Sequence, residues 1–424
     1  MDLHTGRTLW SESDISPKSY PRLDGDVQSD VVVVGGGIGG AIAAWEIAER
    51  GFQVVVVERH RVGMGSTRGN TGLLQYANDM PLAEMIRVHG RARAVAFYRR
   101  CREGVGRIRE IVKQLPEDVE FADRMSVCYA SVPAHIPRLK DEARALAQHG
   151  FAADLVVGRD ELRRAFGIDR EAALVTYGDA EVNPLKFTRA LLAELVRRGA
   201  ARVFERTAVV RTEENDAHVA VETDAGFRVR ARAAVIATGY VFQNTRPLAG
   251  ARLGCTYAIA TEPLSDLAAW PEGVLIWETA RPYLYMRTTR DRRLVVGGLD
   301  LPVPDGPRRD GDLNVRAEQL ARLTQQVLPD IGPVSIAYRW ASTFGSTTDG
   351  WPVVGAHPGF RRVFCSLGYG GNGTVCYAVA ADIIARRMAG EARPEDDVLG
   401  PDRFALWRRA AKRLSAVMTH GAPG

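Results

Sequence analysis

The sequence lacks the features of a secreted or membrane-spanning protein. Among its 424 residues, no apolar run approaches the about 18 to 20 residues that are needed to cross a bilayer. The first 28 residues are polar and contain no apolar signal core, so secretion is not expected. The five cysteines form no CxxC pair, and their odd number fits scattered reduced thiols. We therefore predict a reducing, cytoplasmic location.

A metal-binding pattern and a strong excess of charge are also missing. The eight histidines include no HExxH and no other close ligand spacing, so no metal site is predicted. The net charge of +5 is modest and partly local, since several basic residues surround Trp407. They are Arg403, Arg408, Arg409, Lys412 and Arg413. This cluster predicts a basic helix or tail over residues 401–424, either solvated or in contact with an anionic membrane surface or partner. Neither interpretation implies nucleic-acid binding.

The strongest positive signal is a glycine-rich turn between a predicted strand and a predicted helix. Residues 31–34 are four valines, which are typical of a strand buried on both faces of a parallel sheet. Gly35, Gly37 and Gly40 follow with GxGxxG spacing, which permits a tight turn, close approach to a pyrophosphate and close packing of the helix. That helix, from Ile38 to about residue 50, would direct its free N–H groups and positive dipole end at the phosphates.

A carboxylate completes this motif. A second apolar strand, residues 53–57, ends at Glu58, which is 18 residues beyond Gly40. An acid at this position accepts hydrogen bonds from a ribose diol and disfavours a 2′-phosphate. Farther along, residues 233–237 form another apolar strand that ends in Thr238 and Gly239, where a ligand could approach the mouth of the sheet. An adenine dinucleotide site is therefore predicted, and a structural turn without ligand is the alternative.

Four stretches of the chain resemble the FAD-dependent superfamily of D-amino acid oxidase, glycine oxidase and sarcosine oxidase. They are residues 30–58, the glycine- and hydroxyl-rich segment 63–72, the strand end 237–239 and the C-terminal block 348–390. Their order and approximate separations match the family, so the similarity covers most of the chain. The resemblance implies that the dinucleotide is FAD. We expect it to be non-covalent, because no cysteine falls at the family's attachment position.

The resemblance also implies roles for residues around the nucleotide. Glu58 would hold the adenosine ribose, and Arg59 would lie near the adenine. The loop of Gly65, Ser66 and Thr67 would run along the pyrophosphate, where backbone N–H and side-chain O–H groups can both meet phosphate oxygens. Without the family, this loop would be interpreted as a surface turn.

A C-terminal segment, Gly368-Tyr-Gly-Gly-Asn-Gly373, matches GxGxxG a second time, before a predicted helix over residues 374–388. A second nucleotide site is disfavoured, because no second strand with a ribose-binding acid follows Gly390. We expect instead that the helix directs its positive N-terminus at the pyrimidine edge of the flavin, where negative charge gathers on reduction. The predicted flavin contacts are Gly370, Gly371, Asn372, Gly373 and Thr374, and Tyr369 is a candidate catalytic residue.

The predicted fold class is α/β, of mixed α+β type, with a Rossmann-like FAD-binding domain and an inserted, β-sheet-rich substrate domain. No internal repeat or long linker divides the chain, and the nucleotide-binding features recur in separate stretches, which favours a discontinuous domain. The FAD-binding domain is predicted over residues 27–80, 150–245 and 340–400, the substrate domain over 81–149 and 246–339, and an N-terminal arm over 1–26. Helices are predicted over 81–115, interrupted by glycines, and from Asn183 and Pro184 through Arg198.

The family's chemistry would be hydride removal from a carbon that bears an amine, with flavin N5 as acceptor, followed by hydrolysis of the imine. The protein then needs only to bind and orient the amine and exclude water, so no general base is expected. Tyr283, Tyr285 and Arg287 alternate with period two and would share one face of a strand. This face is predicted to line a pocket for a polar or carboxylate-bearing substrate, and a solvent-facing ladder is the alternative.

A second group of candidates follows the flavin loop. Gln75, Asn78 and Asp79 could recognise an amine, and a helix-entry loop is the alternative. The arginine that grips the substrate carboxylate in glycine and D-amino acid oxidases has no counterpart here, because residues 343–346 are Thr-Phe-Gly-Ser and Arg339 is the nearest arginine. A simple α-amino acid would therefore need Arg287 or Arg339 instead.

The oxygen-activating lysine of sarcosine oxidases also has no evident counterpart, since Leu-Val-Val-Gly-Gly-Leu occupies residues 294–299. A dehydrogenase that passes electrons to another acceptor is therefore an alternative to an oxidase that uses O2. Two further hypotheses are an FAD-dependent monooxygenase and a flavin-binding protein without catalytic activity. A monooxygenase should carry a Gly-Asp motif near the last flavin strand, which this sequence does not have.

Overall fold

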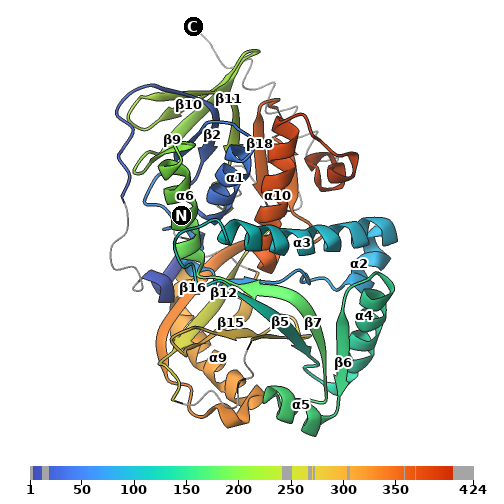
Figure 1. Cartoon of the computed structure of the whole chain (residues 1–424). Coiled ribbons are helices and arrows are strands. Elements are labelled where there is room, and N and C mark those ends of the chain that lie inside the picture. Colours follow the sequence, from blue (N-terminus) through green and yellow to red (C-terminus); the bar gives the residue numbers. More distant parts are fainter. Residues whose placement is uncertain are drawn as a thin grey trace.

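The computed structural model describes residues 3–11, 19–240, 251–265, 270, 273–302, 306–357, 359–367 and 369–403. Within these residues the strands form two sheets, one in the upper and one in the lower half of Figure 1. The predicted basic segment over residues 401–424 lies almost entirely outside the described residues. Its first arginine, Arg403, is described, and it forms an ion pair of 2.6 Å with Asp349.

The upper sheet has eight strands and contains the first glycine motif. Its main path is β17 (Val353–Ala356), β18 (Val363–Leu367), β11 (Arg228–Ile236), β2 (Val27–Val34), β3 (Val54–Val57) and β8 (Ala201–Phe204). Beside this path, β10 (Val219–Thr223) pairs with β11, and β9 (Val209–Glu214) pairs with β10. Strand β2 runs parallel to both β3 and β11, as a Rossmann-like sheet requires.

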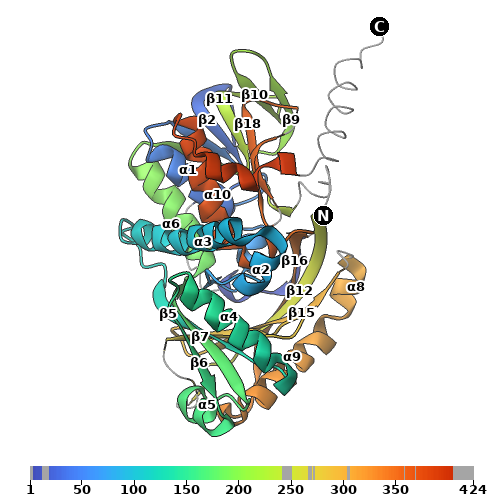
Figure 2. The ribbon, with the colours of Figure 1, turned by 90° about the vertical axis from the view of Figure 1, so that its right-hand side faces the viewer.

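The alternation of side chains along β2 buries both faces of this sheet. Val31 and Val33 pack in one cluster with α1 (Ile38–Ala48), α6 (Pro184–Arg197) and α10 (Gly373–Met388). Val32 and Val34 point the other way and pack in a second cluster with residues of β10. Figure 2 shows the three helices on one side of the sheet and β9 and β10 on the other. The continuous valine run is explained by this double burial.

The lower sheet has ten strands. Its path is β1 (His4–Arg7), β16 (Ile336–Thr347), β12 (Ala251–Thr261), β15 (Leu294–Leu301), β14 (Tyr285–Thr288), β13 (Val274–Glu278), β5 (Ala122–Tyr129), β7 (Ala172–Glu181) and β4 (Leu73–Leu74). Strand β6 (Ala153–Val157) pairs with β7. The helices α5 (Arg159–Phe166) and α9 (Leu313–Val327) pack on one face, α4 (Ile136–Gln148) packs on the other, and α8 (Gly306–Gly311) precedes α9.

The two predicted helical regions are both present. The first forms α2 (Leu82–His89) and α3 (Arg91–Val112), which are separated by Gly90 with a φ of +82°. Gly104 does not interrupt α3. It lies where this helix packs against Val375 and Val379 of α10. The second is α6, and the Asn183 side chain accepts a hydrogen bond of 3.1 Å from the backbone N–H of Lys186, as expected of an N-cap.

The predicted mixed α/β fold with a Rossmann-like sheet is confirmed, but strand pairing differs from the predicted domain ranges. Strands β6 and β7 were predicted within the FAD-binding domain, yet they belong to the lower sheet. Strand β16 also belongs to the lower sheet, although most of its residues, from 340 onward, were predicted in the FAD-binding domain. Pairing over such sequence distances leaves no local signal in the chain. The division into two domains, with the ranges given above, remains a prediction.

Candidate functional site

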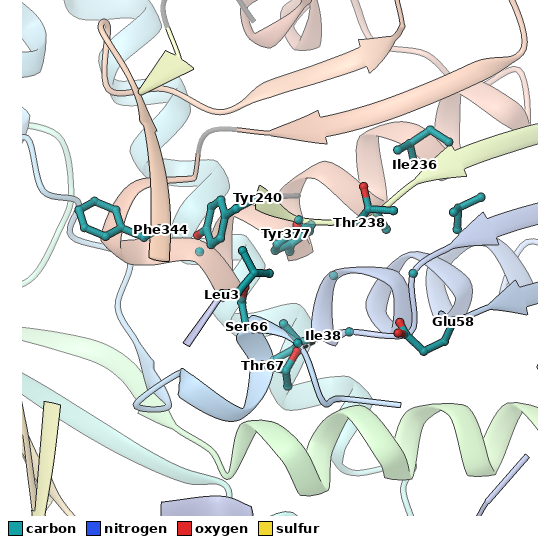
Figure 3. Close-up of a pocket in the computed structure, with 18 of the residues that line it drawn as sticks. Leu3, Ile38, Glu58, Ser66, Thr67, Ile236, Thr238, Tyr240, Phe344 and Tyr377 are labelled. Atoms are coloured by element: carbon teal, nitrogen blue, oxygen red, sulfur yellow. Dashed lines mark hydrogen bonds between the residues drawn. The ribbon is translucent and has the colours of Figure 1, made fainter. Parts of the chain in front are cut away.

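A cavity of about 1610 Å³ extends from the glycine motif of the upper sheet to the strands of the lower sheet. It exceeds the roughly 300 to 1000 Å³ of a typical small-molecule pocket, so it has room for a dinucleotide and a substrate. Figure 3 shows Glu58 toward one end, Tyr240 and Phe344 toward the other, and Ser66, Thr67 and Thr238 between them.

The first glycine turn has the close contacts that the motif predicts. Gly35 has a φ of +114°, and a Cβ there would lie 2.5 Å from the carbonyl oxygen of Ala237. A Cβ on Gly40 would overlap the carbonyl oxygen of Gly35, so this glycine fits the third position, where helix and strand pack together. Gly35 and Gly37 line the cavity, as does Ile38 at the start of α1, whereas Gly40 lies behind the turn.

Side chains from neighbouring loops hold this turn in place. The Glu58 carboxylate accepts hydrogen bonds from the backbone N–H groups of Gly36, at 2.7 Å, and His60, at 2.8 Å. The Thr67 hydroxyl accepts a hydrogen bond of 2.9 Å from the backbone N–H of Ile38, at the first turn of α1. Glu58 therefore has a fixed orientation at the edge of the cavity.

The loop before Thr67 and the end of β11 complete the nucleotide side of the cavity. Arg59, Gly65, Ser66, Thr238 and Gly239 all line it. No atom lies within 4 Å of the position that a Cβ on Gly65 would take, so this backbone borders open space. Glycines without side-chain obstruction, hydroxyl and N–H donors, and a carboxylate at a strand end fit the phosphates and ribose of an adenine dinucleotide.

The C-terminal glycine segment lines the cavity from the opposite side. Its Gly370, Gly371, Asn372, Gly373 and Thr374 all face the cavity, at the N-terminus of α10. Not all of these donors are free. The backbone N–H of Gly371 donates a hydrogen bond of 3.0 Å to Asp79. The side-chain amide of Asn372 donates to the carbonyl oxygen of Gln75, so the segment is connected to the loop after β4.

The lower sheet contributes an aromatic and acidic wall. Trp277, Tyr283, Tyr285 and Asp300 line the cavity from strands β13 to β15 and the connection between β13 and β14. The Tyr283 hydroxyl donates a hydrogen bond of 2.9 Å to Asp79, which also lines the cavity. Burial raises the pKa of Tyr285 to about 12, so its hydroxyl stays protonated near neutral pH.

Two candidate catalytic residues lie elsewhere. Arg287 does not line the cavity: its guanidinium is 3.2 Å from the Glu181 carboxylate and donates a hydrogen bond of 2.8 Å to the carbonyl oxygen of Thr71. Tyr369 is buried, and its ring is tilted by 33° against that of Tyr377, with ring centroids 3.8 Å apart. Its hydroxyl donates a hydrogen bond to the carbonyl oxygen of Ser366. Neither side chain lines the cavity in this structure, so the geometry does not support a direct substrate contact for Arg287 or a position for Tyr369 in the cavity wall.

Of the remaining substrate candidates, some line the cavity and others do not. Gln75 and Asp79 line the cavity, whereas the Asn78 side chain is buried and donates a hydrogen bond of 2.9 Å to the carbonyl oxygen of Tyr76. Arg339 pairs with Asn314 at 3.0 Å and does not line the cavity either. Neither arginine that could have replaced the missing carboxylate-binding arginine faces the site.

Sequence reasoning missed several residues of the cavity wall. Thr256, Trp277, Phe344 and Asp300 come from four different strands or strand ends, and no local motif connects them. Asp300 had one local signal, since it is an acid at the end of an otherwise apolar strand. Tyr240, directly after Gly239, could have been included with the predicted strand end.

Two general features of the described residues bear on the site. No group of three or more His, Cys, Asp or Glu side chains among them is arranged to hold a metal ion. Over the same residues, no helix combines the length and apolarity that a membrane span requires.

The class of protein follows from comparison with known families. The model of the family DAO, described as FAD dependent oxidoreductase, matches residues 30–387. The match covers most of the chain, which therefore belongs to this family. It is an FAD-dependent oxidoreductase, and the GxGxxG turn, the acid after the second strand and the cavity between the sheets are consistent with its cofactor, FAD.

Three individual relatives share between 18% and 28% sequence identity with this chain. YhfW of Bacillus subtilis (strain 168), whose name describes a Rieske 2Fe-2S iron-sulfur protein, is 27% identical over 403 residues, which are 94% of this chain and 76% of YhfW. Gamma-glutamylputrescine oxidoreductase of Escherichia coli (strain K12) is 28% identical over 89% of this chain and 87% of its own length. The crystal structure of glycine oxidase from Geobacillus kaustophilus has a TM-score of 0.72 at 18% identity, covering 88% of this chain and 98% of that one. This last similarity shows the fold.

Proposed function

We propose that the protein oxidises the C–N bond of a small amine or amino acid. The observation that carries the proposal is the continuous cavity, which connects a dinucleotide motif at one end with an aromatic and acidic wall at the other. Gamma-glutamylputrescine oxidoreductase and glycine oxidase, two relatives by sequence or structure, have names that describe oxidation of amine-bearing compounds.

Each part of the cavity would have a separate task. The glycine turn at Gly35 and Gly37, with Glu58 and the loop at Gly65, would hold the nucleotide part of FAD. Bound FAD supplies the acceptor for the hydride that leaves the carbon next to the nitrogen, and the resulting imine is hydrolysed by water after release. The aromatic wall around Tyr283 and Tyr285 would orient the substrate carbon and exclude water during that step.

The electron acceptor and the cellular location complete the proposal. We propose that either O2 or another acceptor receives the electrons. All five cysteines are buried and free, which supports a reducing, cytoplasmic environment. A small-molecule substrate, rather than a nucleic acid, fits a cavity whose lower-sheet wall is aromatic and acidic.

Anaerobic reduction of the bound flavin tests the proposed reaction. The purified holoenzyme would be mixed with a panel of primary amines, N-methyl amino acids and D-amino acids, and the flavin absorbance near its visible maximum would be recorded. We expect at least one amine to bleach the flavin. Admission of air to the reduced enzyme then separates an oxidase, which recovers its colour quickly, from a dehydrogenase, which recovers slowly.

The same experiment distinguishes the alternatives. Reduction by NADPH alone, with no response to any amine, would replace amine oxidation by monooxygenation. A protein that binds FAD but is reduced by neither class of donor would be a flavin-binding protein without this turnover.

A further inference from the structure

Asp300 occupies an irregular position in strand β15. Along the pairing of β12 with β15, Cys255 is opposite Leu301 and Tyr257 is opposite Gly298, so Thr256 faces two residues, Leu299 and Asp300. This is a β-bulge. Leu299 has a φ of +57°, a left-handed conformation that is rare for a residue with a side chain.

The bulge changes the face of the sheet on which the side chains after it lie. Before the bulge, Leu294 and Val296 pack in the core cluster beneath the sheet, and Gly297 lies on the opposite face, directly under the Tyr285 ring. Regular alternation would continue with Asp300 in that core. Instead Leu299 and Leu301 pack against the core, and Asp300 lines the cavity.

The position that results is unusual for a carboxylate. The Asp300 oxygen Oδ1 is buried and has no hydrogen-bond partner. Burial is the main reason that the pKa of Asp300 is raised to about 6; the nearby Asp79 raises it further, and Thr256 and Arg281 oppose the rise. A left-handed leucine and a desolvated acid both cost stability, and features of this kind are concentrated at functional sites.

The charged side chains that line the lower-sheet end of the cavity are acidic. Among the described lining residues, those from the loop after β4 and from the lower sheet include two acids, Asp79 and Asp300, and no arginine, lysine or histidine. Arg281 is close, but its guanidinium lies 4.8 Å above the Tyr283 ring and donates a hydrogen bond of 2.5 Å to the carbonyl oxygen of Asp79. It does not line the cavity.

From this geometry we propose that Asp300 binds a cationic nitrogen of the substrate, and that the substrate is an amine without a carboxylate at this end. The proposal rests on the proposed function for the identity of the site. The bulge directs the carboxylate into the cavity, where an ammonium group can satisfy the unpaired Oδ1, and aromatic rings of Trp277 and Tyr285 would favour the same cation. A carboxylate-bearing substrate would instead meet two like charges and no arginine.

A matched pair of probes tests the proposal without turnover. Benzamidine and benzoate are planar and of similar size, but the first is a cation without an oxidisable C–H bond next to nitrogen, and the second is an anion. Each would be titrated into the oxidised holoenzyme at pH 8, with perturbation of the flavin absorbance as the readout. We expect benzamidine to bind more tightly than benzoate.

Substitutions then assign the preference to one side chain. Asp300→Asn, which keeps the size and removes the charge, should weaken benzamidine binding by about 10- to 100-fold, the loss expected for a hydrogen bond between charged groups. Benzoate binding should be unchanged or stronger. Asp300→Glu should keep much of the affinity for benzamidine, and Asp300→Ser serves as a second charge-free variant if the Asn variant does not retain FAD.

Asp123→Asn is the matched control, since Asp123 belongs to the same sheet but is 67% exposed and paired with Arg109. This variant should bind both probes as the natural protein does. Equal binding of benzamidine by the natural protein and by both charge-free variants would overturn the proposal, as would tighter binding of benzoate than of benzamidine. Benzamidine binding that depends on Asp300, in a protein whose flavin no amine reduces, would instead contradict the proposed function alone.

Discussion

Arg287 and Glu181 form an ion pair of 3.2 Å in which each side chain is only 3% exposed. The pair connects β14 with the end of β7, two strands of the lower sheet that are not neighbours. Arg287 thereby connects strands of the sheet beneath the cavity wall, and its side chain does not line the cavity.

Replacing Arg287 by Met should therefore reduce stability much more than substrate recognition. Arg287→Met leaves the buried Glu181 carboxylate with Arg124, at 2.8 Å, as its remaining partner, and it removes the donors to the carbonyl oxygens of Thr71 and Val182. We therefore expect the free energy of unfolding to fall by about 2 to 3 kcal/mol. Urea unfolding followed by circular dichroism measures this change. Arg290→Met, in the same hairpin, removes an exposed pair with Asp118 and should cost less than about 1 kcal/mol. An unchanged unfolding midpoint in Arg287→Met, together with a raised KM, would restore Arg287 as a substrate residue.

Gly40→Ala should disrupt the packing of α1 against β2. The added methyl group would overlap the carbonyl oxygen of Gly35, which is backbone and cannot rotate away. We expect a loss of about 3 kcal/mol in stability and poor retention of FAD, measured by thermal unfolding and by the flavin content of the purified protein. Gly25→Ala is the control, because no atom lies within 4 Å of its Cβ position. Wild-type behaviour of Gly40→Ala would contradict the packing role of this glycine.

Gly65→Ala should separate cofactor binding from folding. Its added methyl group meets no protein atom and would project into the space proposed for the pyrophosphate. We expect a nearly unchanged unfolding midpoint for the FAD-free protein and an FAD dissociation constant raised about tenfold, equivalent to about 1.4 kcal/mol. Quenching of FAD fluorescence on binding provides the measurement. If affinity stays at the natural value, the pyrophosphate does not lie against Gly65.

Glu58→Gln tests the carboxylate at the end of β3. The amide has one acceptor oxygen in place of two and carries no charge, so the contacts proposed with the ribose diol become weaker. The FAD dissociation constant should rise by about 10- to 100-fold, on the scale of hydrogen bonds to charged groups. Glu49→Gln, at the far end of α1, removes an exposed pair with Arg198 and should bind FAD normally. Equal affinity in both variants would exclude Glu58 from ribose binding.

The raised pKa of Asp300, about 6, predicts a pH dependence with a definite sign. Above pH 6 the carboxylate is ionised and can pair with a cation, and below pH 6 it becomes neutral. For a cationic substrate, the ionisation of Asp300 should therefore add an upward step in kcat/KM near pH 6. The groups that act on Asp300 are Thr256, Asp79 and Arg281, and Asp300 in turn raises the pKa of the Tyr283 and Tyr285 hydroxyls. Burial keeps both tyrosines neutral in this range, so neither contributes a step.

The contribution of Asp300 to the free energy of unfolding should decrease as the pH rises through this range. Asp300 binds its proton more tightly in the folded protein than the ordinary value of 3.8 for the unfolded chain, so ionisation costs folding energy as pH rises from about 4 to 6. In the absence of ligand, Asp300→Asn should unfold at a higher temperature than the natural protein at pH 8, and this advantage should disappear near pH 4. The step in kcat/KM should also be absent from this variant. A variant that retains the step would assign it to another group.

Much of the nucleotide end could be predicted because its signals are local. The valine run, the spacing of Gly35, Gly37 and Gly40, and the acid at position 58 lie within 30 residues, and each constrains the backbone of its own neighbourhood. The N-cap at Asn183 was predictable for the same reason. The period-two pattern correctly placed Tyr285 and Arg287 on one strand, but Tyr283 lies before that strand begins. Arg287 lies farther along the strand, past the cavity and in contact with Glu181.

The sequence by itself thus determined the class of fold and the dinucleotide turn, since short-range geometry dictates where glycine and valine are required. The choice of FAD as the dinucleotide came from the resemblance to a known family and not from that geometry. Only the tertiary structure decided which side chains form the substrate wall. Strands from distant parts of the chain meet there, and a single extra residue opposite Thr256 turns Asp300 from the core to the cavity. A bulge changes the direction of every side chain that follows it, and the alternation of residue types does not reveal its position.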